Sequence, residues 1–90
     1  MNRYKLIRER DGLTKVGNYA DWISWKEDGK FKEKHDKPAI GRSLVIDGRQ
    51  SMNYTWLTTD VTEILIEEDN YIKFKTKNST YELYIEINKR

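Results

Sequence analysis

The segment from residue 49 to residue 56 holds the densest set of side chains able to recognise a ligand. It reads Arg-Gln-Ser-Met-Asn-Tyr-Thr-Trp, so it combines a guanidinium, two amides, hydroxyls and two aromatic rings. Arginine beside aromatic rings suits base stacking and phosphate pairing, and the same composition suits a protein-interface hot spot. We therefore expect ligand or partner contacts from Arg49, Gln50, Asn53, Tyr54 and Trp56. In the alternative interpretation, Trp56 and Met52 pack into the core and the polar residues lie on a loop.

Two other positions and a lysine run extend the candidate binding surface. Trp25 follows Trp22 by three residues, so on a strand the two rings would point to opposite faces and one would be exposed. Arg42 adds a second guanidinium. The basic patch has few compensating carboxylates, with Glu33 and Asp36 interleaved among Lys30, Lys32, Lys34 and Lys37. The lysines at 73, 75 and 77 share a face with Glu82 and Glu86, which is typical of a solvated, partly paired sheet surface.

No set of residues predicts catalysis or metal binding. His35 is the only histidine, lies in a charged segment, and is expected to be a solvated loop residue. Cysteine is absent, so a zinc site is not expected. The acidic cluster 67–69 lacks the spacing of a calcium loop, and the five glycines are isolated rather than gathered in a phosphate loop. We therefore expect a protein that is not an enzyme, with no catalytic residues, metal or cofactor.

Length and charge limit the partners. The 90 residues predict one small domain spanning 1–90, with 17 basic and 15 acidic side chains and a net charge of +2. This net charge is far smaller than that of a dedicated nucleic-acid-binding protein. The chain has no apolar run suited to a signal peptide or a membrane span, so we expect a cytoplasmic protein without a membrane partner.

The clearest elements are two alternating segments, 71–77 and 80–87, which predict a β-hairpin with residues 78 and 79 as its turn. Asn78 suits a positive φ there. This register places Phe74 opposite Leu83 and Lys75 opposite Glu82. The β-rich segment 61–67, followed by a turn at 68–70, adds a third strand and completes an antiparallel meander.

Further strands are expected at 3–8, at 39–47, and near Tyr54 or Trp56. The segment 18–29 has two interpretations. Asn18 could cap a short helix near 19–27 with Gly29 after its end. Asp28-Gly29 could instead be the turn of a hairpin between 22–27 and 30–34, and this second interpretation is favoured. The lysine-rich segment after the turn is then a charged edge strand or a loop.

Five or six short strands in a chain of this length predict a mainly β fold. We expect a small SH3-like barrel or a bent antiparallel sheet that ends in the three-stranded meander, with one short helix near 19–27 in the alternative version. Closing a barrel would remove the exposed strand edges that a small sheet must otherwise protect.

Three segments carry a resemblance to known sequences. Gly41-Arg-Ser-Leu44, Leu57-Thr-Thr-Asp-Val-Thr-Glu-Ile64 and Phe74-Lys-Thr-Lys-Asn-Ser-Thr-Tyr-Glu-Leu83 resemble a pattern found in small uncharacterised phage and bacterial β-domain proteins. The stretch that contains them covers about half of the chain. The resemblance implies a compact SH3-like architecture and an origin in phage or mobile-element genomes, and it transfers no catalytic residue.

Two functions from different classes follow. The first is a non-catalytic module, a phage or mobile-element accessory, that binds and inhibits a host protein. The alternative is a binder that sequesters a nucleotide-type anion or nucleic acid, in one version as a homo-oligomer. A small nucleotide fits the modest net charge better than a long polynucleotide does.

Overall fold

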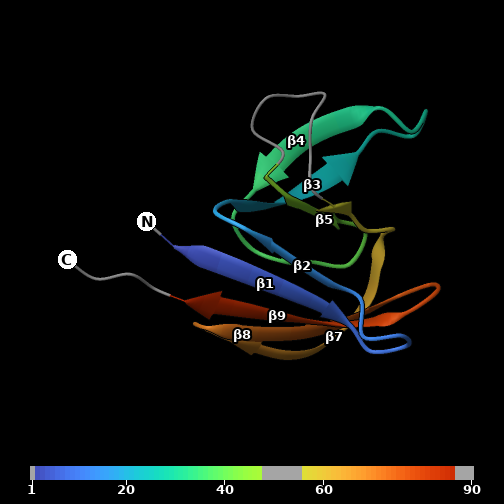
Figure 1. The fold of residues 1–90 in the computed structure, drawn as a ribbon. Coiled ribbons are helices and arrows are strands. Elements are labelled where there is room, and N and C mark those ends of the chain that lie inside the picture. The colour runs from blue at the N-terminus through green and yellow to red at the C-terminus, as the bar shows by residue number, and fades with distance from the viewer. Residues whose placement is uncertain (1, 48–55, 87–90) are drawn as a thin grey trace.

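A computed structural model describes residues 2–47 and 56–86, and within them the chain forms nine β-strands. No helix able to cross a membrane occurs in that part of the chain. The strands, shown in Figure 1, are β1 (Arg3–Arg8), β2 (Thr14–Gly17), β3 (Ala20–Trp25), β4 (Phe31–His35), β5 (Ser43–Ile46), β6 (Trp56–Leu57), β7 (Val61–Glu68), β8 (Tyr71–Thr76) and β9 (Thr80–Glu86). The mainly β prediction is confirmed, and the short helix near 19–27 is wrong because β3 occupies that segment.

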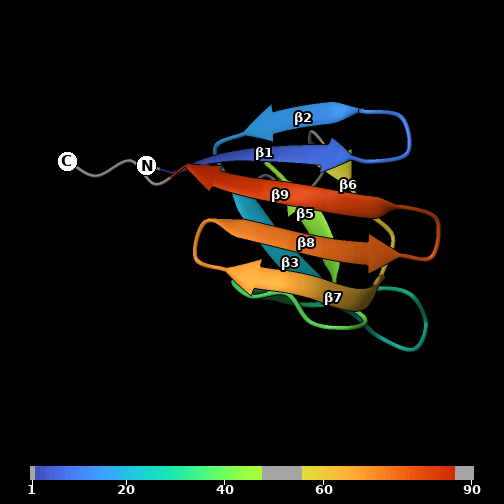
Figure 2. The ribbon, with the colours of Figure 1, turned by 90° about the horizontal axis from the view of Figure 1, so that it is seen from below.

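The strands form two antiparallel sheets that face each other. The larger has the order β2-β1-β9-β8-β7 and the smaller β4-β3-β5-β6. Figure 2 shows β3 and β5 crossing obliquely behind the larger sheet. Near one corner, Val61 N donates to Arg42 O at 2.7 Å and Gly41 N donates to Val61 O at 2.9 Å. The result is a two-layer, bent antiparallel fold rather than the closed barrel that was the other expectation.

The C-terminal meander of β7, β8 and β9 is confirmed, but the predicted hairpin register is wrong by two residues. Phe74 lies opposite Tyr81 rather than Leu83, and Lys75 lies opposite Thr80 rather than Glu82. Thr76 N donates to Ser79 O at 2.8 Å, so residues 77 and 78 form the turn, and Asn78 does not adopt a positive φ. A shift of two residues leaves every side chain on its predicted face, so alternation alone could not distinguish the two registers.

The hairpin interpretation of residues 18–29 is confirmed by β3 and β4. Lys26 N donates to Lys30 O at 2.8 Å, and Gly29 adopts φ 84°, a conformation that favours glycine. The following strand, β4, is the charged edge of the smaller sheet. Charged side chains on an edge strand oppose unwanted pairing with another chain.

Two strands differ from the expected boundaries. The predicted strand 39–47 is reduced to Ser43–Ile46, because Ala39 to Arg42 form a turn in which Arg42 N donates to Ala39 O at 3.1 Å. Strand β2 was not predicted; its four residues pair with β1 and form an edge of the larger sheet. Strands β1 and β6 agree with the expectations for 3–8 and for Trp56.

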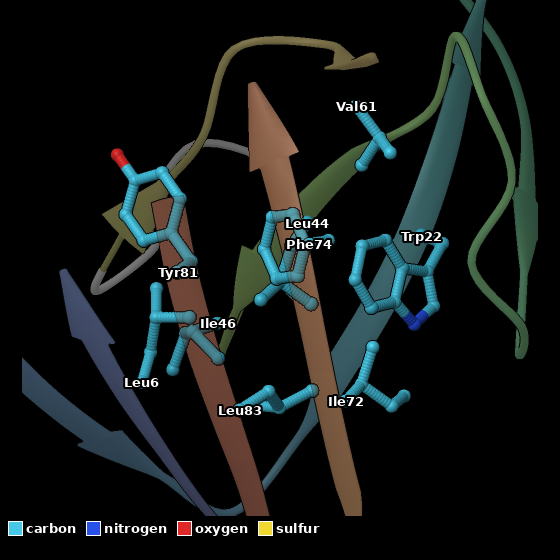
Figure 3. Packing of buried hydrophobic residues seen from close by; sticks show 9 residues of the cluster. All are labelled: Leu6, Trp22, Leu44, Ile46, Val61, Ile72, Phe74, Tyr81 and Leu83. Carbon is cyan, nitrogen blue, oxygen red and sulfur yellow. The ribbon is translucent and has the colours of Figure 1, made fainter. Parts of the chain in front are cut away.

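The two sheets share one hydrophobic core. Phe74, fully buried, packs edge-on against Trp22 at a centroid distance of 5.1 Å and stacks on Tyr81 at 5.4 Å. Figure 3 shows the nine buried side chains of this core, which are Leu6, Trp22, Leu44, Ile46, Val61, Ile72, Phe74, Tyr81 and Leu83. Since they come from β1, β7, β8 and β9 on one side and from β3 and β5 on the other, the core holds the layers together.

Candidate functional site

Four of the predicted binding residues, Arg49, Gln50, Asn53 and Tyr54, lie outside the described part of the chain. The others can be placed. Trp56 begins β6, Trp25 ends β3, and Arg42 precedes β5. Of the basic patch, Lys32 and Lys34 lie on β4, Lys30 precedes that strand and Lys37 follows it. The candidate binding residues that can be placed therefore lie on several different strands and loops.

Trp56 is half-buried and packs against the shared core. Two cations of the larger sheet approach its ring, the Arg8 guanidinium carbon at 5.4 Å from the ring centroid and the Lys15 ammonium at 5.3 Å. Such contacts between a cation and an aromatic ring are attractive. The ring thus contributes to contact between the two sheets.

Trp25 takes part in a chain of side-chain hydrogen bonds. Its indole Nε1 donates to the Ser43 hydroxyl at 3.0 Å, and that hydroxyl donates to Asp60 Oδ1 at 3.1 Å. Ser43 is only 1% exposed, so this chain satisfies a buried hydroxyl and ties β3 and β5 to the segment that leads into β7. Trp22 points into the core, whereas Trp25 is half-buried and bonds to Ser43.

The structure brings Arg42 together with two lysines of the basic patch. Lys34, Lys37 and Arg42 line a concavity of about 600 Å³ together with Asp21, His35 and Asp36; we call it the basic concavity. The Arg42 guanidinium donates from Nη1 to Lys37 O at 2.9 Å, which holds the side chain against its own loop. Lys30 and Lys32 do not line this concavity.

His35 corrects an expectation. It is half-buried at the end of β4 rather than solvated in a loop, and it lies opposite Trp22. Its Nε2 lies 3.1 Å from the Ser24 hydroxyl oxygen. The same hydroxyl lies 3.3 Å from Glu33 O, to which it can donate a hydrogen bond. If the serine donates to that carbonyl, Nε2 must carry the proton that bonds to Ser24. This arrangement ties the end of β4 to β3.

A further surface lies on the outer side of the five-stranded sheet, which Figure 2 shows with no described strand in front of it. The strand registers place two rows of outward residues across this sheet. One row runs Val16, Lys5, Tyr84, Tyr71 and Glu68; the other runs Thr14, Ile7, Glu82, Lys73 and Ile66. We call the surface formed by these two rows the tyrosine face.

Glu82 organises the centre of the tyrosine face. The Tyr71 hydroxyl donates to Glu82 Oε2 at 2.5 Å and the Tyr84 hydroxyl at 3.3 Å, while the two rings lie 5.0 Å apart. The hydrogen bond to Glu82 raises the pKa of Tyr71 to about 12. Partial desolvation and the charge of Glu82 also raise the pKa of Tyr84. Both phenols are therefore neutral donors at physiological pH.

An ion pair borders this cluster. Lys73 Nζ lies 3.1 Å from Glu9 Oε2, and this hydrogen-bonded contact raises the pKa of Lys73. Beside Tyr84, a concavity of about 320 Å³ is lined by Arg3, Lys5, Val16, Tyr84 and Glu86. Tyr84 itself remains 41% exposed and Val16 43% exposed.

The alternation of the last strand already indicated that Glu82 and Tyr84 face outward. What it lacked was the neighbouring strand β2, which supplies Val16, and the pairing of β1 beside β9. Those are contacts between residues far apart in the chain, so no local pattern could join them into one surface. Composition instead drew attention to the aromatic segment 49–56.

Fold and sites together define a small two-sheet β protein with a tyrosine face that no described strand covers and a basic concavity on a separate surface. Within residues 2–47 and 56–86, no group of three or more His, Cys, Asp or Glu side chains is arranged to hold a metal ion. No family model, curated protein or solved structure matches the chain. Function is therefore inferred from the geometry of these two surfaces.

Proposed function

We propose that this protein is a non-catalytic binding protein that docks a partner protein on its tyrosine face. The observation that carries the proposal is the position of Tyr84, which is 41% exposed at the centre of a five-stranded face that no described strand covers. Large aromatic residues at the centre of a surface are the side chains that most often carry the energy of protein association.

The composition of the face suits a protein better than a polyanion. Apolar Val16 and Ile66 stand at its two sides, 43% and 40% exposed, around the tyrosine pair. Its charges alternate, since Lys73 lies opposite Glu82 and Arg3 lies opposite Glu86 at its border. Interleaved carboxylates repel phosphate groups, whereas tyrosines, apolar anchors and a mixed polar rim are typical of protein interfaces.

The tyrosine pair is also held in place before any partner binds. Both hydroxyls bond to the same carboxylate oxygen and the rings contact each other, so little side-chain freedom remains to be lost on association. The concavity beside Tyr84 offers a place for one partner side chain. A rigid aromatic anchor next to a small hollow is the arrangement that supports a hot spot.

The resemblance to phage and bacterial β-domain proteins supports a host protein as the partner. Inhibition would then follow from occupancy, because a bound domain covers part of the host protein's surface. This mechanism needs no reacting group on the domain itself.

The test is capture of the partner by immobilised protein from a lysate of the host cells. Tyr84→Ala should reduce the captured amount of the partner at least about tenfold, because removal of a central aromatic anchor costs roughly 2 kcal/mol or more. Phe31→Ala is the matched control, since Phe31 is 52% exposed on the other sheet. Mass spectrometry identifies and quantifies the partner, and circular dichroism verifies that both variants are folded.

A second substitution tests the same surface without removing the tyrosine ring. Val16→Asp places a charge in the hollow beside Tyr84 and should also reduce the captured amount of the partner. If folded Tyr84→Ala and Val16→Asp proteins both capture the partner as the unchanged protein does, the docking surface lies elsewhere.

A further inference from the structure

We propose that the basic concavity is a binding site for a small phosphorylated anion, separate from the protein-docking surface. Its lining comes from three places in the chain: Asp21 on β3, the end of β4 with the two residues after it, and Arg42 just before β5. Its volume of about 600 Å³ lies within the range of small-molecule sites.

The protein balances the cations of this concavity only in part, and none of them is held in a direct ion pair. Lys34, Lys37 and Arg42 form no ion pair within 4.0 Å in the part of the chain that the structure describes, although Asp21 and Asp36 also line the hollow. Its three cations and two carboxylates leave one positive charge, without counting His35. An anionic ligand with two or more charges would supply the missing partners.

Arg42 is the residue best placed to orient such a ligand. It is half-buried, and its backbone is fixed by two bonds, from Arg42 N to Ala39 O at 3.1 Å and from Val61 N to Arg42 O at 2.7 Å. One of its guanidinium donors bonds to Lys37 O. A guanidinium has five such donors in a rigid planar fork, so the group can bind a phosphate while it keeps that bond.

The chemistry favours a compact phosphate group over a polynucleotide. Lys34 and Lys37 supply point charges, Arg42 supplies directed donors, and the ring of His35 is the only aromatic group of the lining. A polynucleotide site would need a groove several phosphates long and rings on which bases stack. The six lining residues instead surround one open hollow, which suits one or two phosphate groups.

Isothermal titration with sodium pyrophosphate at low ionic strength tests the site. Arg42→Gln should weaken binding by about tenfold to hundredfold, the effect of losing charge-assisted hydrogen bonds. Lys34→Gln should weaken it less, because the exposed lysine contributes charge without a rigid fork. Asp36→Asn should strengthen it by about fivefold or less, because it removes a repelling carboxylate.

Two controls separate this site from general attraction and from the tyrosine face. Arg3→Gln removes an exposed cation of the other sheet and should leave pyrophosphate affinity unchanged, as should Tyr84→Ala. Three results would overturn the proposal: no measurable binding, equal weakening by Arg3→Gln and Arg42→Gln, or binding of single-stranded DNA without binding of pyrophosphate. None of them bears on capture of a partner by the tyrosine face.

Discussion

Glu82 shows how one side chain organises a surface. It stands in the middle strand of the larger sheet and accepts hydrogen bonds from the hydroxyls of Tyr71 and Tyr84. A phenolate at either position would lose its bond and face a carboxylate, so the neutral phenol is favoured. The pKa of Tyr71 is accordingly raised from 10.0 to about 12.

The raised pKa of Tyr71 makes the stability of the fold depend on pH in the alkaline range. Because the pKa of Tyr71 is higher in the folded chain than in the unfolded chain, its contribution is fully present below pH 10 and is lost as the pH rises through about 12. We expect Glu82→Gln to lower the pKa of Tyr71 toward 10. The phenolate absorbance, with Tyr71→Phe as the reference that identifies this residue, measures the change.

The acid titration of Asp11 is the control for that experiment, because Asp11 pairs with Arg8 rather than with Glu82. Its bidentate pair with Arg8, at 3.0 and 2.7 Å, lowers the pKa of Asp11 to about 2, so its contribution is present above pH 3.8 and is lost as the pH falls through about 2. Glu82→Gln should leave this acid transition unchanged. A pKa of Tyr71 that is the same with glutamate or glutamine at position 82 would contradict the assigned role of the carboxylate.

At the scale of elements, the turn from β2 into β3 depends on a close approach. Asp47 adopts φ 57°, and its Oδ1 accepts hydrogen bonds from Asn18 N at 2.9 Å and Tyr19 N at 3.1 Å. A Cβ at Gly17 would lie 2.5 Å from Ile46 Cγ2 and 2.6 Å from Asp47 Oδ2. Glycine is therefore required at position 17 for its small size, which allows an edge of one sheet to contact the other.

We expect Gly17→Ala to lower the free energy of unfolding by roughly 1–3 kcal/mol, because Ile46 is fully buried and has little room to move. Chemical denaturation followed by tryptophan fluorescence measures the effect. Thr14→Ala, at an exposed position of the same strand, should change the free energy of unfolding by no more than about 0.5 kcal/mol. Equal midpoints for the two variants would show that β2 does not approach β5 this closely.

At the scale of the whole molecule, a single core supports both binding surfaces. The tyrosine face is the outer side of one sheet, the basic concavity lies at the edge strand and loop of the other, and the core side chains of Figure 3 join them. A chain of this size buries a smaller share of its surface than larger domains do, so each core side chain carries a large part of the stability.

Phe74→Ala tests that dependence. The side chain is fully buried between Trp22 and Tyr81, and its truncation should cost about 3–5 kcal/mol, out of a total of about 5–15 kcal/mol for a typical domain. We expect a markedly lower melting temperature by circular dichroism. Phe31→Ala truncates a 52% exposed ring and should leave the melting temperature nearly unchanged. Similar melting temperatures for both variants would mean that the core is not shared.

Local patterns predicted more of the fold than of the sites. Alternation identified the last two strands of the C-terminal meander and their inward faces, since period-two patterning reflects burial of one face, while β-rich composition identified the first. It missed β2, whose four residues include one large apolar side chain, Val16, and this one is exposed. It also could not distinguish registers two residues apart, where stacking of Phe74 on Tyr81 accompanies the observed pairing.

The sequence by itself determined the class of the fold and the outward direction of Tyr84 and Glu82, and it favoured the β-hairpin at Asp28-Gly29 over a helix, because these depend on neighbouring residues. Only the tertiary structure decided which distant residues share a surface. Arg42 joins Lys34 and Lys37 because its guanidinium bonds to Lys37 O and the three residues line one hollow, and Val16 joins Tyr84 because β1 lies between β2 and β9. Such neighbours are set by the packing of two sheets around one core, which no local pattern records.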